Sequence, residues 1–247
     1  MSITTLLPAP FAWCAVPAGT ITLAHGLGPY DVPAFEIARY PITHVQYEVF
    51  ALAEDGYANP AWWDFSPQAQ RWRAGHPDVE ESQFPAAEMP RTSVSWYEAV
   101  AFTRWLSTRE GEAVRLPTEQ EWQRAAQGDD DRAFPWGGSW EVDRCNSSES
   151  GIKQPTSVLA YPNGASPYGV LDMSGNIAEW CLNSYHSTDD PDGADAISLI
   201  GSQKRAVRGG SWGLSHHSAR VDFVSFNHAE DRFSYQGFRV VRQAGDL

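Results

Sequence analysis

The sequence is poor in cysteine and in basic residues. Only three cysteines occur among its 247 residues, Cys14, Cys145 and Cys181, and neither their odd number nor their spacing fits a disulfide framework, a zinc site or a redox motif. Lysine and arginine total 18 against 31 aspartates and glutamates, so the formal net charge is −13. This negative charge disfavours nucleic acid and anionic membranes as partners.

Long apolar runs are absent as well. No stretch approaches the ~20 residues that a membrane-spanning helix needs. The N-terminus has no basic region and meets Pro8 and Pro10 early, so it does not resemble a signal peptide, and we expect a cytoplasmic protein. Apolar residues nevertheless make up 42% of the chain and aromatic residues 13%, enough for a packed core. Eleven tryptophans predict that polar partners for indole N–H groups run through this core.

Three helices are predicted from the same start signal, the capping box. In this pattern a serine or threonine precedes the helix and a glutamate or glutamine follows three residues later, each side chain bonding to the backbone of the other residue. The three pairs are Thr43 with Gln46, Ser95 with Glu98, and Thr118 with Glu121. A glycine, which readily ends a helix, follows each of them, at Gly56, Gly111 and Gly128.

The remaining chain predicts short strands and long loops. Residues 11–23 read as two strands broken at 17–19, and residues 57–90 read as a loop pinned by tryptophans. After residue 128, turn-forming residues recur at short intervals, with strands expected at 178–182, 205–208 and 238–241. No linker interrupts residues 1–247. We therefore predict a single α+β domain with much irregular structure.

The segment 205–242 has a regular frame and an irregular interior. It opens with the motif RGGSW, in which paired glycines allow positive φ or close backbone approach, and it closes with GFRVVR, which alternates like a strand. Between these motifs His, Ser, Asp, Asn, Val and Phe are mixed without a clear period. A rigid frame that carries an irregular insert is typical of a binding surface or an active site.

Eight motifs in order resemble the formylglycine-generating enzyme (sulfatase-modifying factor) family. They cover residues 11–242 and read IARYPITHVQYEVF, SWYEAVAFTRWL, RLPTEQEWQRAA, FPWG, CNSSESG, YPNGASPYGVLDMSGNIAEW, RGGSW and GFRVVR. The resemblance implies a variant of the C-type-lectin fold, with a small twisted sheet, about three helices and long ordered loops. This fold agrees with the α+β interpretation reached from the residues alone.

The founding activity of that family is not expected here. The resemblance implies a copper-dependent oxidation by two cysteines, at positions that align with about Leu214 and Ala219. No cysteine follows Cys181, and a soft Cu(I) site needs thiolates, so we predict no catalytic residue of this kind and no copper. An alternative stays open, a metal-dependent or cofactor-independent oxidoreductase of the same superfamily.

The histidines could belong to such an alternative site. Related non-haem iron enzymes recruit histidines from a separate helical domain, which this chain lacks. His216 and His217 are adjacent in the sequence, and in an extended chain neighbouring side chains point to opposite sides. His186 or His228 could join one of them in space. Exposed histidines without a metal are the favoured interpretation for each.

Another group with a similar fold comprises the variable proteins of diversity-generating retroelements. There, codons between GGSW and GFR are mutated at adenines, so the resemblance implies varied positions that exclude Lys, Glu, Gln, Met and Trp. Residues 213–217, 221–228 and 233–235 stay within the permitted set, and we interpret 218–220 and 229–232 as a constant frame. The predicted ligand-binding residues are Trp212, Gly213, Leu214, Ser215, His216, His217, Val221, Asp222, Phe223, Val224, Ser225, Phe226, Asn227, His228, Phe233, Ser234 and Tyr235.

The composition of this segment resembles that of an antibody-like binding surface. Aromatic side chains such as Phe226 and Tyr235 can anchor a partner at low entropic cost, while Ser, Asn, Asp and His supply adaptable hydrogen bonds. Phe238 is expected in the core, whereas Phe223 and Phe226 fit the core and the surface equally well. We therefore predict a protein or another surface ligand as the partner.

The family resemblance also implies structural calcium. One site would use Asp172, Gly175, Ile177 and Glu179, and a second, shortened one would use Asn146, Ser147 and Ile152, with Glu149 nearby. Calcium binds carboxylate and carbonyl oxygens in irregular loops, as these segments offer. A hydrogen-bonded turn with an interior salt bridge to an arginine explains residues 172–179 equally well, and both interpretations stay open.

Overall fold

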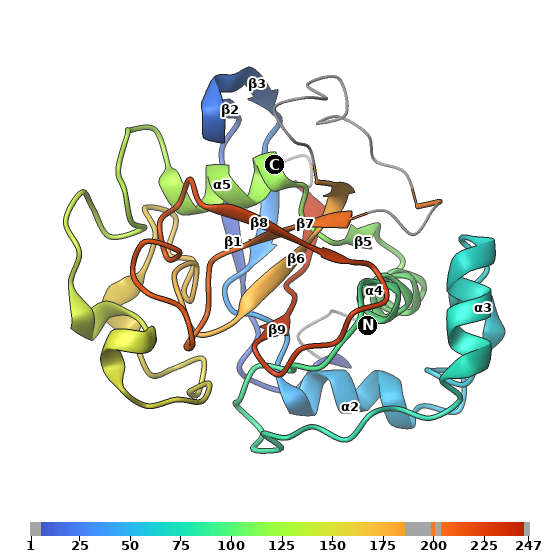
Figure 1. The fold of residues 1–247 in the computed structure, drawn as a ribbon. Helices are drawn as coiled ribbons and strands as arrows, with labels where there is room; N and C mark the ends of the chain where they lie inside the picture. The colour runs from blue at the N-terminus through green and yellow to red at the C-terminus, as the bar shows by residue number, and fades with distance from the viewer. Residues whose placement is uncertain (1–5, 186–198, 201–203, 245–247) are drawn as a thin grey trace.

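The computed structural model describes residues 6–185, 199–200 and 204–244. Within these residues, three antiparallel or mixed sheets and the four helices α2 to α5 are connected by long loops (Figure 1). The first sheet has the order β1-β4-β10-β5, the second pairs β2 with β3, and the third has the order β8-β7-β6-β9. The strands are β1 Trp13–Val16, β2 Gly19–Leu23, β3 Leu27–Val32, β4 Phe35–Ala38, β5 Val114–Arg115, β6 Ala178–Ser184, β7 Lys204–Arg208, β8 Val224–His228, β9 Gln236–Gly237 and β10 Val241–Gln243.

The two ends of the chain meet in the first sheet. Strand β4 pairs with β1 on one side and with β10 on the other, so residues 35–38 tie the N-terminal strands to the last strand. In Figure 1 the loops that follow α5 lie on one side of the β8-β7-β6-β9 sheet, and α2 and α3 lie on the other. The N- and C-terminal thirds of the sequence thus form one body. Within the described residues, no helix is both long and apolar enough to cross a membrane.

The three predicted helices are confirmed. They are α2 His44–Leu52, α4 Trp96–Glu110 and α5 Glu119–Gln127. Both bonds of the expected capping box are made at α4 and α5, whereas at α2 the side chain of Gln46 accepts from the N–H of Thr43 at 3.0 Å and the Thr43 hydroxyl has no hydrogen-bond partner among the described residues. Gly111 and Gly128 follow α4 and α5 directly, and both have positive φ. Helix α2 ends four residues earlier than the glycine predicted, since its C-cap is Ala53.

A fourth helix corrects the prediction of a structureless loop at 57–90. Helix α3 spans Pro67–Gly75, with Ser66 as an N-cap that accepts a hydrogen bond from the backbone of Ala69. Serine followed by proline is a helix-start signal, but only Ala69 and Trp72 of this helix are buried, so no apolar period accompanied the signal. The last predicted strand is also displaced, from 238–241 to β10, because Phe238 and Val240 turn into the core.

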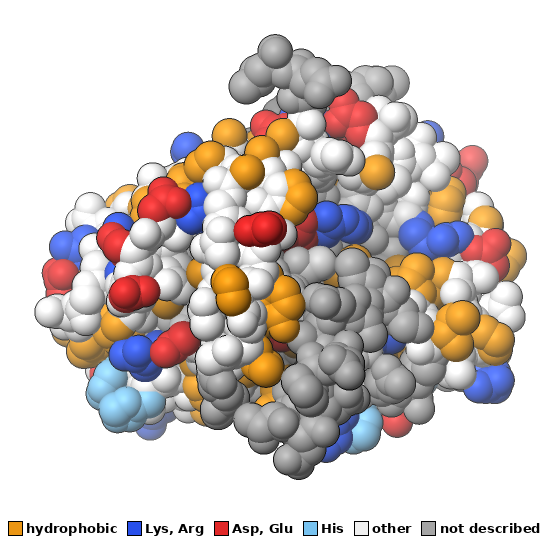
Figure 2. Space-filling view, turned by 90° about the horizontal axis from the view of Figure 1, so that it is seen from above, with side chains coloured by type: hydrophobic (Ala, Val, Ile, Leu, Met, Phe, Trp, Pro, Cys, Tyr) orange, Lys and Arg blue, Asp and Glu red, His pale blue; other side chains and the backbone are white. Residues whose placement is uncertain are grey.

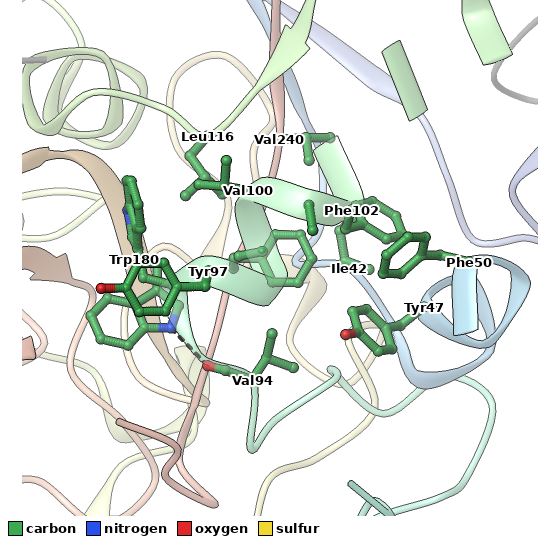
Figure 3. Packing of buried hydrophobic residues seen from close by; sticks show 14 of the residues in the cluster. Ile42, Tyr47, Phe50, Val94, Tyr97, Val100, Phe102, Leu116, Trp180 and Val240 are labelled. Atoms are coloured by element: carbon green, nitrogen blue, oxygen red, sulfur yellow. Dashed lines mark hydrogen bonds between the residues drawn. The ribbon is translucent and has the colours of Figure 1, made fainter. Parts of the chain in front are cut away.

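Helix α4 lies at the centre of the larger core (Figure 3). Phe102 of this helix stacks on Tyr47 of α2 with ring centroids 5.8 Å apart. Indole nitrogens donate to backbone carbonyls through the core, from Trp180 to Val94 at 2.8 Å and from Trp96 to the carbonyl of Cys181 at 2.9 Å. These bonds confirm the expected polar seam, and they attach the sheet strand β6 to the start of α4.

Buried ion pairs join the C-terminal segment to the rest of the fold. Arg208 of β7 bonds Glu119 of α5 at 2.5 Å, and Arg232 bonds Glu98, the capping-box residue of α4, at 2.6 Å. Arg239 bonds Glu179 of β6 at 2.6 Å, and neither side chain is exposed to solvent. These ion pairs with buried glutamates therefore fix the position of the segment that follows RGGSW.

Candidate ligand-binding surface

The predicted binding segment contains a regular strand. Residues 212–223 form turns, β8 pairs antiparallel with β7 along its whole length, and residues 229–235 return to β9. The prediction of an irregular insert is therefore wrong for 224–228. Val224 and Phe226 alternate with Ser225 and Asn227, as on a strand, but this alternation covers only five residues at the edge of the sheet. The strand was therefore not predicted from the sequence.

Most predicted ligand-binding side chains reach solvent. Exposed are Gly213, Leu214, His217, Phe226 and His228, and all the others except Val221 are half-buried. Phe226 is 38% exposed, so the surface interpretation holds for it, whereas Phe238 is fully buried, as predicted.

Val221 corrects the predicted set. Its side chain is 1% exposed and packs in the smaller core, so it cannot contact a ligand directly.

Backbone groups anchor this segment. The carbonyl of Phe233 accepts from the N–H of Ser93 at 3.0 Å, and that of Tyr235 accepts from Ala178 at 2.8 Å. On the other side, the carbonyl of Leu214 accepts from Ser148 at 2.9 Å. Every residue type offers the same carbonyl, so these bonds do not depend on the side chains present. The segment can therefore keep its course while its side chains differ.

Several of the residues interpreted as a constant frame make inward contacts, whereas Glu230 among them is exposed. Ala219 and Ala229 are buried, and the carbonyl of Ala229 accepts from the N–H of Trp96 at the start of α4. Arg232 forms the ion pair with Glu98. Arg220 differs, because its guanidinium is 42% exposed and pairs only with Asp222 on the surface.

The motifs RGGSW and GFRVVR each contain a glycine at a point of close backbone approach. Gly210 has φ +69°, and a Cβ there would lie 2.5 Å from the carbonyl oxygen of Ser218. A Cβ on Gly237 would lie 2.2 Å from the carbonyl oxygen of Arg91. The sequence prediction of positive φ and close backbone approach at the paired glycines is confirmed.

In an extended chain the side chains of His216 and His217 would point to opposite sides, but in the structure they lie on the same side. Their ring centroids lie 4.1 Å apart because residues 216–219 form a turn. Glu149 accepts from the backbone N–H of His216 at 2.9 Å and lies 2.8 Å from its ring Nδ1. Partial burial opposes ionisation of Glu149, but the bonds from His216 and Ser147 outweigh it and lower the pKa of Glu149 to about 2. An ionised carboxylate makes Nδ1 the donor, which fixes the orientation of the ring.

An aromatic group beside these histidines was missed from the sequence. The ring of Trp140 lies 5.3 Å from that of His216 and 6.0 Å from that of Trp136, and both tryptophans rest on the buried ring of Phe134. Three aromatic residues within 134–140, around the motif FPWG, were the available signal. Only the tertiary structure brings them to residues 213–217.

The segment predicted for the first calcium site holds a buried ion pair. Arg239 donates to both carboxylate oxygens of Glu179, at 2.6 and 2.7 Å, and the indole of Trp122 donates to the same group at 2.9 Å. While it holds these bonds, Glu179 does not fit a calcium ligand. The interior salt bridge that the sequence left open is present, and calcium binding here stays an untested prediction.

Two other predicted cation ligands, Asn146 and Asp172, take part in one hydrogen-bond network. Asn146 bonds the side chain of Asn176, which in turn donates to Asp172 at 2.9 Å. Burial raises the pKa of Asp172 to about 7, although Asn176 and Arg239 oppose this shift.

In the second segment, Ser147 donates to Glu149, and Ile152 is 42% exposed. Within the described part of the chain, no three His, Cys, Asp or Glu side chains gather as metal ligands.

Comparison with known proteins identifies relatives of this chain. The sequence profile of the Sulfatase-modifying factor enzyme 1-like domain matches residues 13–244. Hercynine oxygenase of Mycolicibacterium smegmatis is 29% identical over 239 residues, which cover 85% of this chain and 53% of that protein. Inactive C-alpha-formylglycine-generating enzyme 2 of Mus musculus is 31% identical over 202 residues, covering 74% and 58%. The chain thus spans about half the length of the curated relatives it matches.

A solved structure supports the same fold. Treponema denticola variable protein 1 has a TM-score of 0.71 to this chain at 22% identity, and the match covers 95% of both chains. Identity at this level concerns the fold alone. The expected architecture, the C-type-lectin-like variant typical of formylglycine-generating enzymes, is confirmed.

Proposed function

The chain belongs to the sulfatase-modifying factor family, and from that premise we propose that it is a ligand-binding member without formylglycine-generating activity. Its binding surface comprises the solvent-facing side chains of residues 212–235, carried on the C-type-lectin-like scaffold. The partner is a protein or another ligand that presents a surface. We further propose that this segment is diversified, as in the variable proteins of retroelements.

One observation carries this proposal. Residues 212–235 are held by backbone hydrogen bonds and by inward frame residues, while most of the remaining side chains reach solvent. A scaffold of this kind tolerates new side chains because the contacts that hold it do not involve them. An active site needs the opposite, namely particular side chains held in one arrangement.

The sequence supports the lack of oxidase activity. Leu214 and Ala219 stand where the family resemblance implies the cysteine pair, and neither side chain can bind copper. A relative named as an inactive formylglycine-generating enzyme, 31% identical to this chain, illustrates that family members occur without that activity.

Variation among natural copies of the gene tests the proposal. We expect sequenced copies from related strains to differ at the codons for 213–217, 221–228 and 233–235, and to agree at 218–220 and 229–232. A template repeat rich in adenine, beside a reverse transcriptase gene, is expected nearby. Substitutions spread evenly over the whole chain would contradict diversification. A binding surface of constant sequence would then remain, to be tested by substitution of its exposed residues.

A second candidate function is an oxidoreductase of the same superfamily, dependent on a metal or free of cofactors. It is favoured by the orientation of His216 by Glu149, since a carboxylate that accepts from one ring nitrogen prepares the other as a ligand or a base. Elemental analysis of purified protein separates the two functions for the metal-dependent case. Iron or copper retained at about one atom per chain would favour the oxidoreductase, and substitution of His216 by alanine should then release the metal.

A further inference from the structure

A ridge of aromatic rings borders the proposed binding surface. We define the aromatic ridge as Trp136, Trp140, His216 and His217, seated on the buried ring of Phe134. Consecutive ring centroids along the ridge lie 6.0, 5.3 and 4.1 Å apart. Both tryptophans are only half-buried, and the indole N–H of Trp136 is already bonded to the carbonyl of Ser139. The N–H of Trp136 is therefore already satisfied, and the solvent-exposed parts of both aromatic rings are what the ridge offers to a partner.

Elsewhere the protein covers such faces with its own basic side chains. Arg205 lies 3.8 Å from the ring centre of Trp96, Arg232 lies 4.7 Å from that of Trp72, and Lys204 lies 3.9 Å from that of Phe226. Cations over aromatic faces are attracted by the ring quadrupole, most strongly over tryptophan. Among the described residues, no lysine or arginine lies over any ring of the ridge.

Charges around the ridge also favour a basic partner. Glu149, ionised at neutral pH, bonds His216 at the centre of the ridge, and Asp143 follows Trp140 within three residues. The nearby arginines are neutralised, since Arg144 pairs with Glu141 and Arg132 pairs with Asp130. The face shown in Figure 2 carries both acidic and basic side chains, but the whole chain has a net charge of −13. Such a surface attracts a cationic group and repels an anionic one.

We propose that the aromatic ridge docks an arginine or lysine side chain of a protein partner. This inference rests on the proposed binding function and deepens it. Trp136 and Trp140 lie outside the varied segment, so they provide a constant contact, while His216 and His217 belong to the segment proposed to vary. A constant contact of this kind orients different partners in the same way, and the varied residues then select among them.

Short peptides test the ridge without a known partner. The probes are acetyl-Gly-Arg-Gly-amide and its neutral counterpart with glutamine, titrated into ¹⁵N-labelled protein while the indole N–H resonances are followed. We expect saturable shifts of the Trp136 and Trp140 resonances with the arginine peptide, and at least about threefold weaker binding of the glutamine peptide, as expected for an exposed cation–π contact.

Matched variants separate the ring face from its bulk. Trp140→Phe retains an aromatic face and should keep most of the affinity, whereas Trp140→Leu retains an apolar side chain and should lose about threefold or more. Leu52→Ala, at an 80% exposed residue of α2, is the control and should bind like the unchanged protein. Melting curves of all variants establish that they are folded.

Two results would overturn the inference. Equal shifts with arginine and glutamine peptides would leave only a general apolar contact, and shifts with methyl α-glucoside alone would point to a sugar instead. Neither result would touch the proposed binding function, since that depends on the pattern of variation among gene copies. Conversely, arginine binding by the ridge in a gene without variation would leave the ridge as a constant docking site and remove the diversification.

Discussion

The inner and the outer side of residues 205–242 are held by different kinds of contact. On the inner side Arg208, Arg232 and Arg239 each bond a buried glutamate from another part of the chain. On the outer side residues 212–228, except the buried Ala219 and Val221, carry exposed or half-buried side chains, and the backbone makes the anchoring bonds. Inward side chains therefore decide where the segment lies, and outward side chains are left to decide what it contacts.

This difference separates stability from recognition within one short segment. A buried charge without its partner is costly, so the inner residues cannot change singly. An exposed side chain that only touches water can change at little cost. We expect substitutions on the two sides to differ by several kcal/mol in their effect on the free energy of unfolding.

The largest effect is expected from the most buried pair. Arg239→Leu leaves the carboxylate of Glu179 without its cation, so we expect a loss of about 3–5 kcal/mol in the free energy of unfolding. Urea unfolding followed by tryptophan fluorescence measures it. The double variant Glu179→Met with Arg239→Leu removes both charges and should recover part of the loss. A single variant as stable as the unchanged protein would show that the pair does not hold the segment.

A smaller loss is expected where the frame turns. Gly210→Ala places a methyl group against the carbonyl of Ser218 in a backbone with φ +69°, so we expect a loss of about 1–3 kcal/mol. Gly213→Ala, two residues beyond Ser211 on the exposed turn, is the matched control and should change little. Equal losses in the two variants would contradict the distinction between frame and surface.

Outward side chains should hardly affect stability. His217→Ala and His228→Ala remove exposed side chains without a buried partner, so we expect changes within about 0.5 kcal/mol. The same urea unfolding experiment applies. A loss above about 2 kcal/mol in either variant, the range of buried contacts, would place that side chain in the fold and outside the proposed surface.

The smallest effect is expected on removal of calcium. Both oxygens of Glu179 already accept hydrogen bonds from Arg239 and Trp122, so we expect a chelator to lower the melting temperature by less than about 2 °C. Differential scanning fluorimetry with and without EDTA measures the shift. A larger drop that added calcium reverses, with magnesium as the control ion, would instead establish a structural calcium site.

Local signals in the sequence predicted the scaffold well. The capping boxes at Thr43, Ser95 and Thr118 located three helices, because the two bonds of a capping box lie within four residues of each other. The paired glycines before Ser211 predicted positive φ, because this preference depends on the residue itself. The motif pattern predicted the family.

Contacts between distant residues were the part that could not be predicted. Helix α3 buries only two side chains, so its sequence has no clear apolar period. Strand β8 is only five residues long and lies at the edge of its sheet, so its alternation is a weak signal. The burial of Val221 depends on its packing in the smaller core with residues remote in the sequence. The aromatic ridge joins residues 136 and 216, and the ion pairs join residues up to 206 positions apart, as in Arg242 with Glu36.

The sequence by itself determined three of the helix starts, the glycine turns and the absence of the cysteine pair. Each of these depends on residue type and on neighbours a few positions away. Only the tertiary structure decided that Glu179 pairs with Arg239 and that Glu149 orients the ring of His216. It also decided that Trp136 and Trp140 border the proposed binding surface. The physical reason is that burial and pairing depend on which distant segments the packed core brings together. The spacing of residues along the chain does not show which segments these are.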